Sequence, residues 1–291
     1  MNSAPFAVPL ADRIAAAQAR VPLAFRTPLP LRIRKIALWA LFTGLFSWCL
    51  YDFNFAPGRI IDGIGRLGRV LGFMFPPHIW TTWEAWAEVL EGLGETLSMA
   101  FLGTVLGAIL AFPLSFLGAK NINRVFWLRQ GTRRVYDVIR AFETLILALI
   151  FIRAFGLGPL AGILAIAVSE IGTFAKLFSE ALENTSNKPV EGVVASGGSR
   201  LQTIRYAVMP QVLPVHLSVL LYNFESNVRS GTILGIVGAG GIGFLLSDRI
   251  SAYKWDEAWT IIFMIIAMVY VIDWLSGRLR TRLIGKEELA K

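Results

Sequence analysis

The sequence predicts an all-α, polytopic membrane protein with about six transmembrane helices. Of its 291 residues, 55% are hydrophobic and only 16% are charged, whereas an average soluble domain has about 25% charged residues. The mean hydropathy is +0.59. Several apolar runs are also close to the roughly 20 residues that a helix needs to cross a bilayer.

Six stretches can form such helices, because a helix satisfies its backbone hydrogen bonds within its own segment. The first two are 36–53 and 96–119, and the second contains no charged residue. The next two are 136–155 and 155–175. The fifth begins near Pro210 and continues toward the glycine-rich stretch at 232–246, and the sixth covers 258–277.

Lysine and arginine orient these spans, because cytoplasmic loops are enriched in both. Basic clusters precede the first span, separate the second from the third, and follow the sixth, so all three lie on one side of the membrane. Both termini are therefore expected in the cytoplasm. We expect a cytoplasmic segment at 1–35, a transmembrane domain at 36–277 with a cytoplasmic loop at 179–210, and a cytoplasmic tail at 278–291. The N-terminal residues lack the apolar core of a cleavable signal peptide.

Residues 59–75 form a separate amphipathic segment outside the six spans. Arg59, Asp62, Arg66 and Arg69 share one helical stripe, and tryptophans follow at 80, 83 and 86. Such a helix either lies in the outer membrane interface, where tryptophan is favoured, or packs on the outer face without lipid contact.

The composition also excludes several classes of protein. Cys49 is the single cysteine, and the two histidines are far apart, so no metal site or disulfide framework is expected. The basic residues form short clusters between apolar runs rather than one patch, which argues against binding to nucleic acid. The sequence lacks a Walker A motif and a Ser/His/Asp set. Active transport would therefore need energy from another polypeptide.

The connection between the fourth and fifth spans has a helix–break–helix pattern. Lys188 and Pro189 suit a helix start, Gly197 and Gly198 suit its end, and Ser199 can cap a second helix that runs to Met209. The segment EGVVASGGSRLQTIRYAVMP resembles the cytoplasmic loop of binding-protein-dependent ABC importer permeases, whose pattern is E-A-A, three residues, G, nine residues, I-x-L-P.

Three positions of that pattern match, and four differ by small apolar changes. Glu191, Gly197 and Pro210 match, whereas Gly192 and Val193 replace the alanines, Ala207 replaces the isoleucine and Met209 replaces the leucine. The resemblance implies a coupling helix that docks on an ATPase subunit. An ordinary solvated connector is the other interpretation. The coupling residues it implies are Pro189, Glu191, Gly192, Ala195, Gly197, Ser199, Arg200 and Pro210.

Two further segments narrow the resemblance. FESNVRSGTILGIVGAGGIG and GRLGRVLGFMFPP are similar to phosphonate-type permeases, from about residue 58 onward. Methionine permeases share the glycine-rich end of the first segment, but as a rule they do not share the polar ESNVR sequence that precedes it. The resemblance implies the type I importer fold in a bacterial inner membrane, a homodimer surrounded by lipid, two cytoplasmic ATPases that hold ATP and Mg²⁺, and an extracytoplasmic phosphonate-binding protein. The chain itself would bind no cofactor. The expected substrate is phosphonate, phosphite or phosphate; the alternatives are a permease for methionine or another small solute, and a channel without an ATPase.

The glycine-rich stretch also fits a dinucleotide fingerprint, because Gly238, Gly240 and Gly243 have the spacing G-x-G-x-x-G. No alternation of strands and helices surrounds it, so a nucleotide-binding membrane enzyme is a remote alternative. We expect Gly238, Gly240, Gly241 and Gly243 to form a bend or packing point. Gly103 and Gly107 have the spacing that lets two helices approach closely.

A few polar residues lie within the spans, where charges usually face the bundle interior or a water-filled path. Glu225 and Arg229 either line a pathway for an anion or form a salt bridge that locks two helices or two copies together. Arg140 and Glu143 are spaced to pair on the third span. The pathway candidates are Asn223, Glu225, Asn227, Arg229, Ser230, Glu143 and Glu170.

Overall fold

The computed structural model describes residues 15–16, 18–19, 29–74 and 77–284, which are largely helical and contain no strand. The chain divides into two compact units, Met1–Gly72 and Phe73–Lys291. The first unit contains α2 (Leu29–Asp52) and most of α3 (Pro57–Met74). The amphipathic stripe predicted for 59–75 lies on α3, and the glycines of this helix meet no atom within 4 Å of an added Cβ.

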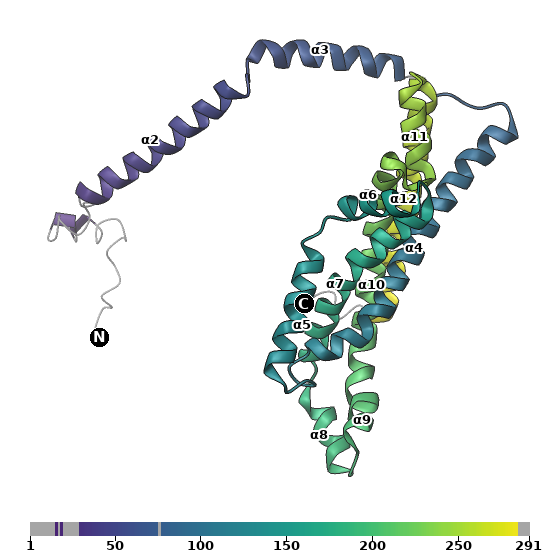
Figure 1. The fold of residues 1–291 in the computed structure, drawn as a ribbon. Helices are drawn as coiled ribbons and strands as arrows, with labels where there is room; N and C mark the ends of the chain where they lie inside the picture. The colour runs from purple at the N-terminus through teal and green to yellow at the C-terminus, as the bar shows by residue number, and fades with distance from the viewer. Residues whose placement is uncertain (1–14, 17, 20–28, 75–76, 285–291) are drawn as a thin grey trace, which may run out of the picture. The chain divides into compact units, whose positions relative to one another are not determined.

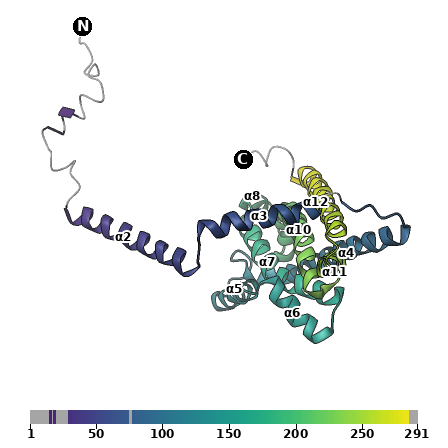
Figure 2. The same ribbon diagram turned by 90° about the horizontal axis from the view of Figure 1, so that it is seen from above.

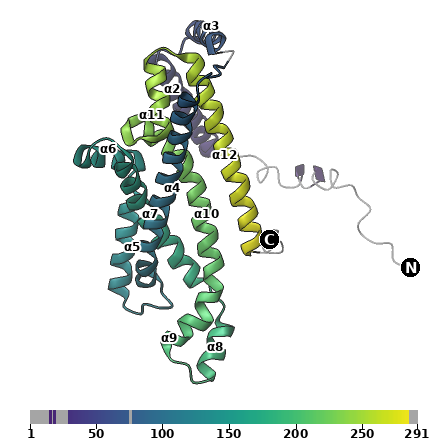
Figure 3. The same ribbon diagram turned by 90° about the vertical axis from the view of Figure 1, so that its right-hand side faces the viewer.

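The second unit is a helical bundle (Figures 1, 2 and 3). Its elements are α4 (Trp83–Gly118), α5 (Phe126–Arg140), α6 (Thr144–Phe155), α7 (Pro159–Glu183), α8 (Asn187–Ala195), α9 (Arg200–Thr203), a π-helical turn η1 (Ile204–Val208), α10 (Met209–Leu234), a second π-helical turn η2 (Gly235–Ala239), α11 (Gly241–Ser251) and α12 (Trp255–Ile284). Figure 2 looks along the bundle and shows α5 and α12 on opposite sides of α7 and α10. The pair α8 and α9 lies at one end and α11 at the other (Figure 3).

Within the described residues, five helical segments are long and apolar enough to cross a membrane. They are Leu29–Asp52, Trp83–Gly118, Pro159–Glu183, Arg200–Ala239 and Trp255–Arg282. The all-α, multi-span prediction is therefore confirmed. Two of the helices are longer than the predicted spans, since α2 begins before residue 36 and α12 continues past residue 277.

The predicted third span, 136–155, is not a single helix. Its residues belong to α5, a turn at 141–143, and α6. With 12 residues, α6 is about 18 Å long, too short for a hydrocarbon core of about 30 Å. The α5 helix carries Arg129, Arg133 and Arg134 and is amphipathic, so its composition also does not suit a complete crossing. Because α5 ends at Arg140, Glu143 does not share a helix with it, and no ion pair between them is present in the described chain.

The fifth span is longer than expected, because the helix that begins at Arg200 does not stop at Met209. It continues through η1 and α10 as far as Val237, and the helical conformation is broken at Gly238, where φ is +105°. In η1, the amide of Met209 donates to the carbonyl of Ile204, five residues earlier. Proline lacks an amide hydrogen and crowds the preceding turn, so a widened turn directly before Pro210 lets the helix continue.

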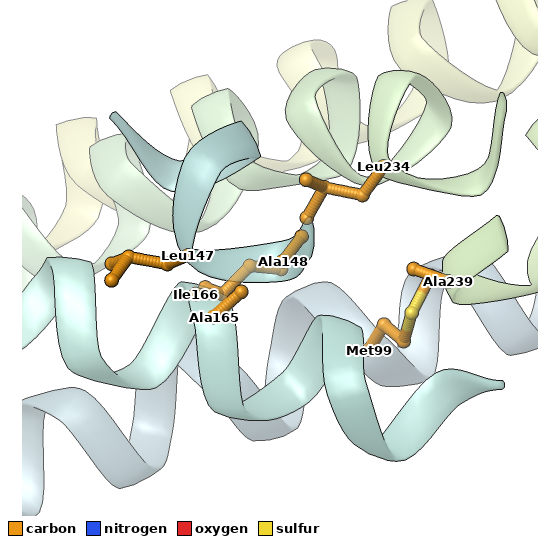
Figure 4. Close-up of a cluster of buried hydrophobic side chains, with 7 residues drawn as sticks. All are labelled: Met99, Leu147, Ala148, Ala165, Ile166, Leu234 and Ala239. Atoms are coloured by element: carbon orange, nitrogen blue, oxygen red, sulfur yellow. The ribbon is translucent and has the colours of Figure 1, made fainter. Parts of the chain in front are cut away.

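The core of the bundle depends on the close approach of α4 and α7. A Cβ added at Gly103 would lie 2.7 Å from Cβ of Ile166, and one at Gly107 would lie 2.7 Å from Cβ of Glu170. Figure 4 shows the adjoining apolar cluster, to which α4, α6, α7, α10 and η2 contribute side chains: Met99, Leu147, Ala148, Ala165, Ile166, Leu234 and Ala239. The cluster connects the C-terminal end of the long α10 helix to the α4–α7 pair.

Candidate functional site

The α8–α9 elbow, residues 184–208, is a compact turn at one end of the bundle. The helix–break–helix pattern predicted from the sequence is confirmed. At the end of α8, the amide of Gly198 donates to the carbonyl of Val193 at 2.9 Å, and that of Gly197 donates to Val194 at 3.0 Å. These two bonds form a Schellman motif, which needs a left-handed residue at Gly197, where φ is +83°.

The start of α9 is fixed by a reciprocal hydrogen bond. The hydroxyl of Ser199 accepts from the amide of Gln202, and the side chain of Gln202 accepts from the amide of Ser199 at 2.7 Å. This is a capping box, which satisfies two amides that the helix leaves without partners. The shape of the elbow is therefore determined by hydrogen bonds between neighbouring residues.

Contacts with the bundle hold the elbow in place. The amide of Ser186 donates to Oε1 of Gln211 at 2.9 Å, and Arg200 donates to the carbonyl of Ile122. Val190 packs against a buried cluster that includes Leu182 and Val212. A displacement of α8 would therefore be transmitted to α4, α7 and α10 through direct contacts.

The tip of the elbow exposes apolar side chains. Val194 is 57% exposed, Leu201 77% and Tyr206 62%. All of the predicted coupling residues are exposed: Pro189, Glu191, Gly192, Ala195, Gly197, Ser199, Arg200 and Pro210. Glycine at 192 and 197 adds no bulk, and a Cβ at either would meet nothing within 4 Å. Exposed apolar patches of this kind suit contact with another protein.

The glycine-rich stretch forms a buried joint at the opposite end of α10, which we call the glycine bend (Gly235–Gly243). The left-handed φ angles are +105° at Gly238, +87° at Gly240 and +71° at Gly241. A Cβ at Gly243 would lie 1.9 Å from the carbonyl oxygen of Thr232. The chain therefore turns and packs here in a way that a side chain would obstruct.

The amides that begin α11 are already occupied by side chains of α4. The amide of Gly241 donates to Oε2 of Glu95 at 2.6 Å, and the amide of Ile242 donates to Oγ1 of Thr96 at 2.9 Å. A pyrophosphate would need these amides and would have to displace a carboxylate. No strand precedes the glycines within the described chain, so the bend lacks both features of a dinucleotide site.

A buried polar junction joins three helices near the middle of the bundle. The Nδ2 atom of Asn227 donates to Oε1 of Glu170 at 2.8 Å and to Oγ1 of Thr104 at 3.0 Å. All three residues are buried, so the structure places two pathway candidates between helices of the same chain. Thr104 was not among the candidates predicted from the sequence, although it lies beside Gly103 on the face of α4 that meets α7.

An ion-pair cluster joins α10 to α12. The carboxylate of Glu225 lies 3.0 Å from Arg229 and 3.0 Å from Arg280, and Arg229 also lies 3.3 Å from Asp273. Of the two interpretations offered for Glu225 and Arg229, this geometry favours the helix-locking salt bridge. In the sequence, Arg280 served only as a marker of topology, because its pairing with α10 depends on tertiary packing.

The remaining pathway candidates are not gathered at one place. Asn223 donates to the carbonyl of Val219 on its own helix at 2.8 Å. Ser230 is partly buried next to Arg229, and Glu143 is exposed in the turn between α5 and α6. The candidates on α10 therefore divide between the buried junction and the exposed α12 side.

Comparisons with known proteins place this architecture among transport permeases. HtxC of Stutzerimonas stutzeri, a permease assigned to a phosphite transport system, is 38% identical over 234 residues, which cover 80% of this chain and 81% of HtxC. The phosphate-import permease protein PhnE of Mycolicibacterium smegmatis is 40% identical over 197 residues, covering 68% of this chain and 37% of PhnE.

A solved structure shows the same fold. A chain of the inward-facing MetNI methionine ABC transporter superposes with a TM-score of 0.61 at 20% identity and covers 70% of this chain and 99% of its own length. The second unit therefore has the fold of ABC type I importer permeases. Residues 95–285 match the family of binding-protein-dependent transport system inner membrane components, and the chain belongs to this family of multi-pass transport proteins.

Proposed function

We propose that this chain is the permease subunit of an ATP-driven importer for phosphonate or a related phosphorus oxyanion, such as phosphite or phosphate. The relatives named for phosphite and phosphate transport support the substrate class, at 38% and 40% identity. The methionine transporter is more distant at 20% identity and shares the fold alone.

The observation that carries the mechanism is the continuity between the elbow and the glycine bend. One helical segment, which begins at Arg200 and is broken at Gly238 within the glycine bend, connects them. The elbow is shaped by its own hydrogen bonds and exposes Val194 and Leu201 for a partner. An ATPase that grips α8 would tilt the α9–α10 segment as a rod, and the movement would reach the opposite end of the bundle.

The proposed assembly contains two copies of this chain, two ATPase subunits at the elbow end, and a substrate-binding protein at the α11 end. The elbow end is cytoplasmic in this proposal, since the basic clusters at 120–134 lie in the neighbouring connection and helix. ATP and Mg²⁺ are held by the ATPases, and this chain binds no cofactor. The binding protein selects the anion and releases it into the permease.

The coupling role is tested with Glu191→Arg and Gly197→Trp in proteoliposomes that contain the ATPase and a phosphite- or phosphonate-binding protein. We expect both variants to insert and Glu191→Arg to keep its folded yield, whereas Gly197→Trp loses some stability because of its left-handed backbone. Uptake of radiolabelled phosphite should fall strongly in both, and ATPase stimulation by the binding protein should be lost. Glu180→Arg is the matched control, because Glu180 is exposed near the same end but lies on α7. Normal uptake by both elbow variants would contradict the proposal.

The competing functions predict different results. Competition by methionine, but not by phosphite or phosphonate, would favour the methionine permease. Uptake that persists when ATP hydrolysis is blocked would favour a channel. An absorbance spectrum of bound flavin or nicotinamide in the purified protein would favour the membrane enzyme.

A further inference from the structure

One exposed surface of the second unit carries charged side chains along two candidate membrane spans. This α10–α12 face consists of Tyr222, Ser226, Arg229 and Ser230 on α10 with Tyr270 and Asp273 on α12. The Arg229–Asp273 pair lies on it, and the two side chains are 46% and 40% exposed. Arg229 follows Val228, which is fully buried against Ala100 and Met268.

That position places the pair within the length of two candidate membrane spans. Ala100 and Met268 belong to the charge-free stretches 96–119 and 258–272 of two candidate spans. A charged side chain in hydrocarbon costs at least a few kcal/mol, so such residues face a partner or water rather than lipid. The exposed face of α4 is different, since it presents no charged side chain at this depth and is mostly apolar, for example at Phe101, Leu106 and Ile109.

Within the ion-pair cluster, Glu225 is enclosed by its partners, whereas Arg229 and Asp273 remain partly exposed. Glu225 is only 11% exposed and is held by Arg229 and Arg280, both at 3.0 Å. Arg229 and Asp273 are joined by longer contacts, 3.3 and 3.4 Å, on the outer side. The four residues have no net charge, so the cluster attracts neither a cation nor an anion overall.

A neighbouring arginine and aspartate form a self-complementary surface. When two copies meet across a two-fold axis, the arginine of each copy can contact the aspartate of the other. We propose that the α10–α12 face packs against the same face of a second copy, with Arg229 of each copy reaching Asp273 of the other. This rests on the proposed function as an assembly with two permease subunits. An apolar segment such as 36–51 of α2 offers no charge to match this pair.

Cysteine cross-linking in membranes tests the surface directly. Cys49→Ala removes the single cysteine, and Ser226→Cys or Ser230→Cys is then introduced alone. We expect mild oxidation to give a disulfide-linked dimer for at least one of the two. Ser98→Cys is the control, because this exposed serine lies on α4, and it should stay monomeric. The proposal would be overturned if both α10 variants stayed monomeric or if Ser98→Cys cross-linked equally well. It would also be overturned if an impermeant maleimide labelled both α10 cysteines and neither cross-linked, because that result indicates a water-filled path.

A charge exchange asks whether the pair reaches across the interface. Arg229→Asp gives a chain with two aspartates, and Asp273→Arg gives one with two arginines, so each mismatches itself. Co-expressed with different affinity tags, the two chains should form mixed dimers in about ten-fold excess over either same-variant dimer, which corresponds to about 1.4 kcal/mol. If the pair acts only within one chain, each chain stays mismatched in every dimer, and equal recovery of mixed and same-variant dimers would overturn the proposal.

Failure of the interface can be separated from failure of the proposed function. The Cys49→Ala chain is assayed for ATPase co-purification and phosphite uptake before any cysteine is introduced. If both are retained while the α10–α12 face neither cross-links nor prefers mixed dimers, only the interface assignment is wrong. Loss of both in this background, together with their absence in the unchanged chain, would contradict the permease function itself.

Discussion

The two glycine turns at opposite ends of the α9–α10 segment use glycine for different reasons. In the elbow, Gly197 has a φ of +83° and open space where a Cβ would be, so its backbone conformation alone requires glycine. In the glycine bend, a Cβ at Gly243 would lie 1.9 Å from a carbonyl oxygen, although Gly243 is helical. Local conformation alone requires glycine in the elbow, whereas the glycine bend requires it both for the left-handed conformation at Gly238, Gly240 and Gly241 and for packing at Gly243.

The elbow is therefore an exposed surface, whereas the glycine bend is a buried connection between helices. The elbow keeps its shape through hydrogen bonds between neighbours, so its tip stays exposed and available to a partner. The glycine bend is held by Glu95 and Thr96 of α4 and is buried against it. We infer that substitutions in the bend act on folding, whereas substitutions at the elbow tip act on assembly.

The largest effect is expected for Gly243→Ala. Ordinary overpacking costs about 1–3 kcal/mol, and the cost here is larger because the added methyl group would lie 1.9 Å from the carbonyl oxygen of Thr232, which is backbone and cannot rotate away. Thermal unfolding of the detergent-purified protein should show a clear loss of stability and a lower folded yield. Gly94→Ala is the control, because a Cβ there meets nothing within 4 Å. Equal stability of the two variants would contradict the packing argument.

A smaller effect is expected for Glu95→Ala, which leaves the amide of Gly241 without its carboxylate acceptor. An unsatisfied buried group costs about 1–3 kcal/mol, and a negative charge near a helix N-terminus adds a favourable interaction. Glu95→Gln keeps an acceptor oxygen and should lose less stability. Glu91→Ala, an exposed position one turn earlier on α4, is the control in the same unfolding measurement. If Glu95→Ala were as stable as Glu91→Ala, the bend would not depend on this contact.

The smallest effect on stability is expected for Gly197→Ala. A left-handed alanine costs about 1–2 kcal/mol, but no atom obstructs its methyl group. Gly197→Asn should lose less, because asparagine adopts this conformation more readily. The same thermal unfolding experiment compares them with Gly243→Ala. A loss at Gly197→Asn as large as that at Gly243→Ala would remove the distinction between the two turns.

Local patterns predicted much of the molecule. The elbow followed from Pro189, the two glycines and Ser199, because caps and left-handed turns are short-range features. The long apolar runs predicted the membrane helices for the same reason, since hydropathy is a property of each segment. The third span was wrong because apolar residues on α6 adjoin an amphipathic α5, and composition alone did not show where one helix ends.

The sequence by itself determined the membrane class, most of the helices and the shape of the elbow, since these depend on residues close together in the chain. Tertiary structure alone decided that Glu95 would cap α11, that Asn227 would join Glu170 to Thr104, and that Arg280 would pair with Glu225. Each of these contacts joins residues more than fifty positions apart. Hydrogen bonds and ion pairs act only over a few ångströms, so their partners are fixed by helix packing, which no local pattern encodes.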